Sequence, residues 1–148
     1  MIDLNENQNA EVKALADRAV SFLASQKWCT RVVGCQAAFV ALGVLGVFLL
    51  RLIPNRTAVD NRLWVVVGDV PPAYLVCDKA PDWQQALAGY VEEMREWVHA
   101  VRSGSSLEGV IPVNAPRTPK YADMLESRLD FIEANFVNIP AESLSGEI

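Results

Sequence analysis

The chain has 148 residues, a length that fits one domain built around a single hydrophobic core. Hydrophobic residues make up 51% of the sequence and charged residues 21%, a balance that excludes intrinsic disorder. Acidic residues number 18 against 13 basic ones, and no short stretch is rich in Lys or Arg, which excludes a role in binding DNA or RNA. We therefore expect one acidic domain over 1–148, with a loose polar tail from about residue 140.

An amphipathic helix is predicted from Asn9 to about Lys27. Apolar residues recur there at helical spacing, and charged residues such as Glu11 and Arg18 lie between them. This pattern is typical of a helix that buries one face. The apolar positions are Val12, Leu15, Ala16, Ala19, Val20, Phe22 and Leu23.

The run Val32–Leu50 allows two interpretations. It contains no charged residue and only one strongly polar one, Gln36, so its length would suit a transmembrane helix that anchors the protein to a membrane. The second interpretation breaks the run near Gly43 into an irregular or helical piece up to Leu42 and a strand over Val44–Ile53. We prefer the second, because the turn signal Pro54-Asn55 follows directly and because two amphipathic helices downstream need an apolar sheet face, from which a membrane helix would remove the first strand.

Two further strands are predicted at Leu63–Val67 and Ala73–Cys77. Both runs are short and apolar, and Gly68-Asp69 and Pro71-Pro72 separate them. Together with Val44–Ile53 they predict a small antiparallel sheet of about three strands.

Two C-terminal amphipathic helices complete the prediction. The first begins after Asp82, a capping residue, and ends before Gly104, which supplies the left-handed residue beyond a helix end. The second has Thr118 as its N-cap, Pro119 in its first turn and an apolar stripe that reaches Phe136. The predicted fold class is therefore α+β, with an N-terminal helix, a three-stranded sheet and these two helices packed on one face.

The segment from Leu63 to Val76, LWVVVGDVPPAYLV, resembles a group of small uncharacterised bacterial proteins. The resemblance extends weakly to Phe48–Pro54, Glu93–Val98 and Met124–Leu129. It implies a soluble protein, and it assigns no activity and no functional residue.

One polar cluster is a candidate ligand-binding site. Asp69, Tyr74 and Asp78, with Asp60 as a further member, are predicted to meet at one end of the sheet, where they would form the polar rim of a pocket for a small molecule or a substrate. The competing interpretation makes Asp69 a turn residue whose carboxylate accepts backbone hydrogen bonds. On that interpretation the cluster has no chemical role.

The remaining residues predict neither a metal site nor a cofactor. Cys29, Cys35 and Cys77 form no CxxC pair, and His99 is the only histidine, so no zinc site and no catalytic residues are predicted. The acidic start of the chain is unlike a secretory signal, which predicts a cytoplasmic protein. We expect a non-enzymatic interaction protein with an immunity, antitoxin-like or adaptor role, whose acidic surface binds another protein or a second copy of the chain.

Overall fold

The computed structural model describes residues 6–55 and 60–140. Residues 141–148, which make up nearly all of the predicted loose tail, lie outside the described residues. The tail therefore stays a prediction. The elements in chain order are α1 (Glu6–Ala24), β1 (Cys29–Ala41), β2 (Leu45–Pro54), β3 (Arg62–Gly68), β4 (Val70–Val76), the short 3-10 helix η1 (Cys77–Lys79), α2 (Trp83–Ser103), α3 (Pro119–Ile132) and the π-helical turn η2 (Glu133–Val137).

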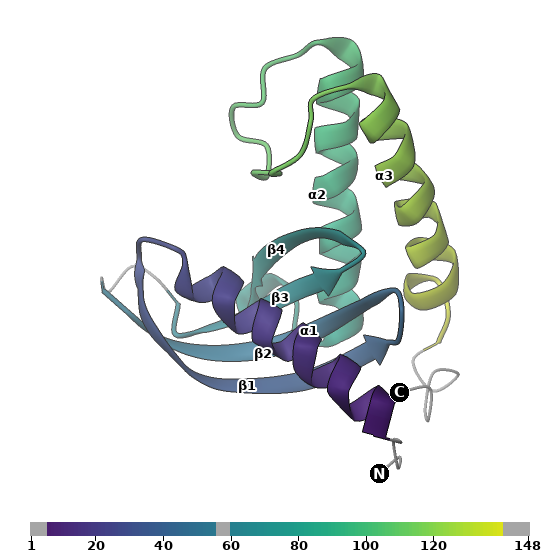
Figure 1. The fold of residues 1–148 in the computed structure, drawn as a ribbon. Coiled ribbons are helices and arrows are strands. Elements are labelled where there is room, and N and C mark those ends of the chain that lie inside the picture. The colour runs from purple at the N-terminus through teal and green to yellow at the C-terminus, as the bar shows by residue number, and fades with distance from the viewer. Residues whose placement is uncertain (1–5, 56–59, 141–148) are drawn as a thin grey trace.

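The predicted α+β fold is confirmed, with one more strand than expected. The four strands form one antiparallel sheet in the order β1-β2-β3-β4, so each strand pairs with its neighbour in sequence (Figure 1). Phe48 of β2 lies opposite Ala37 of β1 and Val65 of β3, and Val65 in turn lies opposite Tyr74 of β4. β1 and β4 are the two edges of the sheet.

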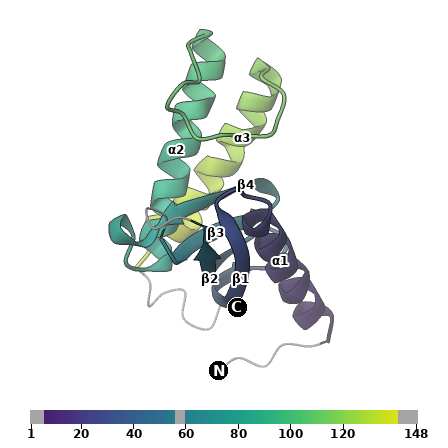
Figure 2. The same cartoon turned by 90° about the vertical axis from the view of Figure 1, so that its left-hand side faces the viewer.

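Helices cover both faces of this sheet, and Figure 2 shows the resulting layers. On one face α1 buries Leu15, Ala19 and Leu23 against Phe48 and Val65. On the other face α2 packs against the strands, and α3 packs on α2. The second core contains Trp64, Val66, Leu87, Tyr90, Met94, Leu125 and Leu129 among its buried residues. The two C-terminal helices therefore lie on the same side of the sheet, as predicted.

The structure corrects the sequence interpretation of the stretch from Val32 to Leu42. It was expected to be irregular or helical, but it forms most of strand β1, which pairs with β2 along its length. Gly43, at φ 78°, makes the tight turn between them, and the Val44 amide donates to the Ala41 carbonyl at 2.9 Å. The run Val32–Leu50 is thus a β-hairpin, because a left-handed glycine in its middle reverses the chain.

No helix within residues 6–55 and 60–140 combines the length and the apolarity that crossing a bilayer requires.

The predicted helix caps of the C-terminal half are confirmed. The Asp82 carboxylate accepts from the Gln85 amide at 2.8 Å, and Gly104 ends α2 at φ 68°. The Thr118 hydroxyl accepts from the Tyr121 amide at 3.2 Å. These caps satisfy backbone groups that a helix end leaves unpaired, so they fix where α2 ends and α3 begins.

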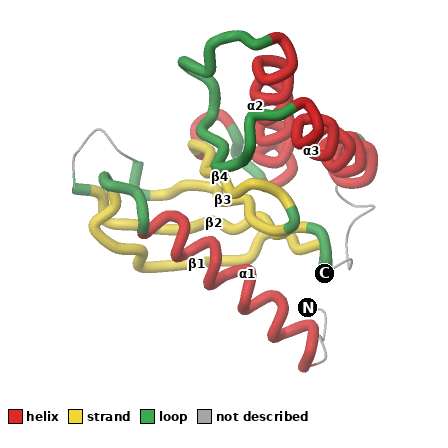
Figure 3. Tube along the Cα trace, turned by 45° about the horizontal axis from the view of Figure 1, so that its top comes forward, coloured by secondary structure: helices red, strands yellow, loops and turns green. Residues whose placement is uncertain are grey.

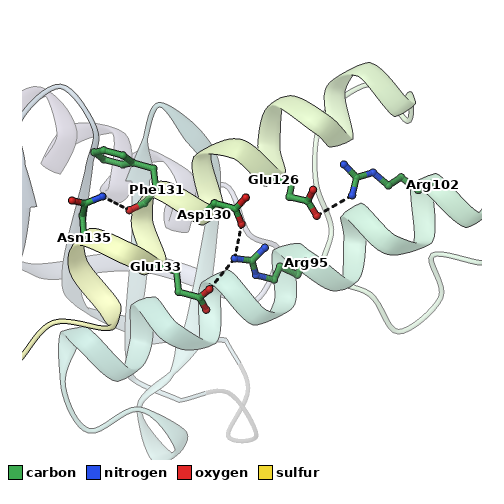
Figure 4. A network of polar contacts seen from close by, with 7 residues as sticks. All are labelled: Arg95, Arg102, Glu126, Asp130, Phe131, Glu133 and Asn135. Carbon is green, nitrogen blue, oxygen red and sulfur yellow. Dashed lines mark hydrogen bonds and ion pairs between the residues drawn. The ribbon is translucent and has the colours of Figure 1, made fainter.

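Ion pairs join α2 to α3 along the side that faces away from the sheet. The Arg95 guanidinium lies 3.0 Å from both Asp130 and Glu133, and Arg102 lies 2.9 Å from Glu126 (Figure 4). Pairs of this kind stabilise little when exposed, but here each arginine bridges two helices, so they fix how α3 is aligned on α2.

One buried hydrogen bond predicts a measurable contribution to stability. Tyr90 of α2 donates its hydroxyl to the Pro71 carbonyl of β4, and burial raises the pKa of Tyr90, so the group stays neutral. Tyr90→Phe leaves that carbonyl unpaired in the core and should lower the free energy of unfolding by about 1–2 kcal/mol. Urea denaturation monitored by circular dichroism measures the loss.

Tyr74→Phe is the matched control, because the Tyr74 hydroxyl forms no hydrogen bond with the described residues and its side chain is exposed. Its free energy of unfolding should change by less than about 0.5 kcal/mol. Equal losses in the two variants would contradict a specific role for the Tyr90 hydroxyl.

Candidate functional site

A groove with a volume of about 880 Å³ runs beside the β4 edge of the sheet. Four parts of the chain line it: the end of α1, strand β4, the middle of α2 and the loop between α2 and α3. Figure 3 shows this loop, in green, returning from the far end of α2 toward β4. The lining side chains include Phe22, Gln26, Pro72, Tyr74, Glu93, Trp97, Val110, Ile111, Val113 and Arg117.

Three aromatic rings meet at one wall of the groove. The Tyr74 ring lies 5.1 Å from the Trp28 ring in an edge-to-face arrangement and 6.4 Å from the Phe22 ring, measured between centroids. Tyr74 is nevertheless 37% exposed. Aromatic side chains held in place by neighbours and still open to solvent offer a rigid apolar contact at low entropic cost, which is typical of binding surfaces.

The opposite wall is an ordered loop. Leu107, Ile111 and Val113 are half-buried and pack against the main core, and the Val110 amide donates to the Leu107 carbonyl at 3.1 Å. The loop therefore has a defined path without forming a helix or a strand. The predicted site did not include it, although a connection of this length between Gly104 and Thr118 is a signal of function in itself.

One acidic and one basic side chain line the groove. Glu93 lines the groove, and Glu92 and Glu96 are exposed on the same helix. Neither Glu92 nor Glu96 forms an ion pair within the described part of the chain, whereas Arg95 on the same helix pairs with α3 (Figure 4). Arg117 lies on the loop side. Glu92 and Glu96 therefore add negative charge to the surface of α2 outside the groove lining, while Arg95 pairs within the chain.

The four residues predicted to form one polar cluster do not come together. Asp69 lies in the turn between β3 and β4, while Asp60 precedes β3 and Asp78 follows β4. The hairpin therefore separates Asp69 from the other two by the length of its strands, roughly 20 Å. Tyr74 lies between these ends and lines the groove. Whether any of the four binds a ligand stays a prediction.

Asp69 takes part in contacts that fasten the turns of the sheet to the helices. Its carboxylate accepts from Arg128 of α3 at 3.1 Å, and its backbone amide donates to the Val44 carbonyl at 2.8 Å. Arg18 of α1 donates to the neighbouring Gly68 carbonyl at 3.0 Å. These contacts favour the structural interpretation of Asp69 as a turn residue.

Asp60 and Asp78 are both near Cys77, on the short helix after β4. The Cys77 thiol donates to the Arg62 carbonyl at 3.6 Å. Burial raises the pKa of Cys77 most, the charge of Arg62 opposes this, and the two carboxylates raise the pKa further. A thiol with a raised pKa is mostly protonated at neutral pH and is a poor nucleophile. The described residues contain no group of three or more His, Cys, Asp or Glu side chains that could hold a metal ion.

The charges around Cys77 predict opposite effects for two substitutions. In a Cys35→Ser background, Arg62→Gln should raise the pKa of Cys77 and slow its alkylation, because the opposing positive charge is lost. Asp60→Asn should lower the pKa and speed alkylation. The pH dependence of iodoacetamide labelling, followed by mass spectrometry, measures both. Shifts of the same sign in the two variants would show that these groups do not surround the thiol as described.

Comparisons with protein-family models, with curated proteins and with solved structures found no match to this chain. The resemblance of the Leu63–Val76 segment to small bacterial proteins therefore stays a prediction.

Proposed function

We propose that the protein is a non-enzymatic interaction protein of the cytoplasm, with an immunity, antitoxin-like or adaptor role, and that the groove beside β4 binds an extended segment of a partner protein. The observation that carries this proposal is the composition of the groove: an exposed aromatic wall and an ordered apolar loop face a space that is about 880 Å³ in volume. These are the elements of a peptide-binding surface.

The groove favours binding through side chains over addition of a strand. Pro71 and Pro72 lie in β4 and have no backbone N–H, so this edge cannot form a continuous ladder with an incoming strand. Tyr74, Ile111 and Val113 instead offer apolar contacts on the two sides of the groove. An extended segment with one or two large apolar side chains would fill the space between them.

The acidic surface of α2 sets the charge of the partner in this proposal. Glu92, Glu93 and Glu96 place three carboxylates within two turns of α2, on a protein with a formal charge of −5. Opposite charge across an interface speeds association and selects the partner more than it adds affinity. The partner segment is therefore one that carries Lys or Arg beside its apolar residues.

The small-molecule alternative has weaker support. Asp69, Tyr74 and Asp78 were its proposed polar rim, and β4 places the two carboxylates at opposite ends of a strand. Asp69 is also paired with Arg128. A single pocket that uses all three would require a different arrangement of the hairpin.

Selection from a phage-displayed library of short random peptides tests the proposal. The selected peptides should combine Lys or Arg with large apolar residues. Glu96→Lys should weaken their binding roughly fivefold, equivalent to about 1 kcal/mol, because it reverses an exposed charge on α2 next to Trp97, which lines the groove. Titration calorimetry measures the dissociation constants.

Two matched controls accompany these measurements. Asp60→Lys makes the same change of charge near Cys77, outside the groove, and should leave binding unchanged. Tyr74→Ala should weaken binding more than Met124→Ala, since Met124 is 44% exposed on α3 but does not line the groove. Peptides without basic residues, or a stronger effect of Asp60→Lys than of Glu96→Lys, would sink the proposal.

A further inference from the structure

The two edges of the sheet differ in whether they can pair with another strand. β4 contains Pro71 and Pro72, which lack the N–H groups that a ladder needs. β1 has no proline, and within the described residues it pairs only with β2. Its residues from Thr30 to Ala38 are exposed or half-buried. The outer backbone groups of β1 thus form the one open edge of the described sheet.

This open edge has bulges and one charged residue but neither the prolines nor the short length that protect most edge strands from pairing. Natural edge strands are short or carry charges, prolines or strong bulges. β1 has 13 residues, and from Val32 to Ala38 it carries no charge at all. Val33 is 47% exposed on it. The register shifts between Val32 and Gly34 and between Ala37 and Phe39 lie at the two ends of this uncharged stretch, and the residues between them, Gly34 to Ala37, pair with β2 in regular register.

We propose that β1 pairs antiparallel with β1 of a second copy of this chain, centred on Cys35, and joins two four-stranded sheets into one. The pairing follows a two-fold axis, so each copy contributes the same surface. It stops at a dimer, because the outer edges of the joined sheet are then the two proline-containing β4 strands.

Charge and register fit a second copy of the chain. With Cys35 at the centre, Gly34 lies opposite Gln36 of the other copy, and Arg31 lies opposite Phe39. The only charged residue from Thr30 to Ala41 therefore faces an uncharged one. Like charges directly opposite each other destabilise paired strands, and among the residues of β1 itself this register places none opposite one another.

A specific contact favours the same register. Arg51 lies opposite Gly34 on the neighbouring strand, and its Nε would lie 3.2 Å from a Cβ at that glycine, so its guanidinium extends over β1. Gln36 shares this face of the sheet, because it lies opposite Leu49, which packs toward α2. In the dimer the Gln36 amide oxygen of the second copy lies beside Gly34, within reach of Arg51. The two-fold axis makes this contact twice.

Sedimentation equilibrium of the full chain tests the proposal. The wild-type protein should dimerise, and Gln36→Lys should raise the dimer dissociation constant at least tenfold, because it sets two lysines against two Arg51 guanidinium groups. Gln85→Lys is the matched control: Gln85 is exposed on α2 and belongs to no strand of the sheet, so its replacement should leave the constant unchanged. A monomeric wild type, or equal effects of the two variants, would overturn the proposal.

Cross-linking provides a second measurement that does not depend on Gln36→Lys folding. Residues opposite each other in an antiparallel pair have Cα atoms about 4.5–5.5 Å apart, a separation that a short bis-maleimide spans. Cys35 is exposed and Cys29 is buried. Cys77→Ser should therefore form a covalent dimer, and Cys35→Ser should not. Cross-linking that persists in Cys35→Ser, or is absent from Cys77→Ser, would overturn the register.

The dimer and the groove can fail independently. The groove lies beside β4, at the opposite edge of the sheet from β1. Gln36→Lys should leave peptide binding intact, and Glu96→Lys should leave the dimer intact. Loss of both properties in either single variant would contradict the separation of the two surfaces.

Discussion

The burial of β3 on both faces is the constraint on which the rest of the structure depends. All five residues from Leu63 to Val67 are buried, and successive side chains point to opposite sides of the sheet. Val65 contributes to the core under α1, and Trp64 and Val66 contribute to the core under α2. Burying a large apolar side chain contributes about 1.5–3 kcal/mol, so a helix layer is needed on each face.

Trp64 also shows how this strand positions the chain that follows. Its indole N–H donates to the Ala80 carbonyl at 2.7 Å, inside the core. The bond satisfies a buried donor and fixes the end of η1, three residues before α2 begins. From there α2 crosses the sheet, and its Tyr90 reaches β4. Trp64 of β3 thus helps to position the start of α2, the helix that forms one wall of the groove.

The sequence was sufficient where local chemistry decides the structure. The caps at Asp82, Gly104 and Thr118 and the strand Leu63–Val67 follow from residue types and their spacing. β1 was missed because a half-exposed edge strand made of Val, Gly, Cys and Ala has neither a helical nor an alternating pattern. Its strand conformation depends on pairing with β2, which lies beyond Gly43.

The candidate site was predicted less accurately than the fold, for two different reasons. The predicted cluster of Asp69 and Asp78 was inconsistent with the strand predicted between them, because the two ends of an extended strand lie far apart. The groove, in contrast, depends on where the loop after Gly104 packs, and the half-buried positions of Ile111 and Val113 are set by tertiary contacts. Alternation within that loop is too short to indicate which residues face β4.

The groove beside β4 and the proposed dimer interface at β1 lie at opposite edges of the sheet, and this placement determines how they would work together. In a sheet joined through β1, the two β4 strands lie at its opposite ends, seven strand spacings apart, or roughly 34 Å. Two grooves held at that separation on one rigid sheet bind a partner with two copies of the same segment much more tightly than one groove does. The gain comes from effective concentration and needs no new contact, so moderate affinity in each groove would be sufficient. In the proposed dimer, the strand that leaves the sheet open would therefore also give the two grooves selectivity for paired or repeated targets.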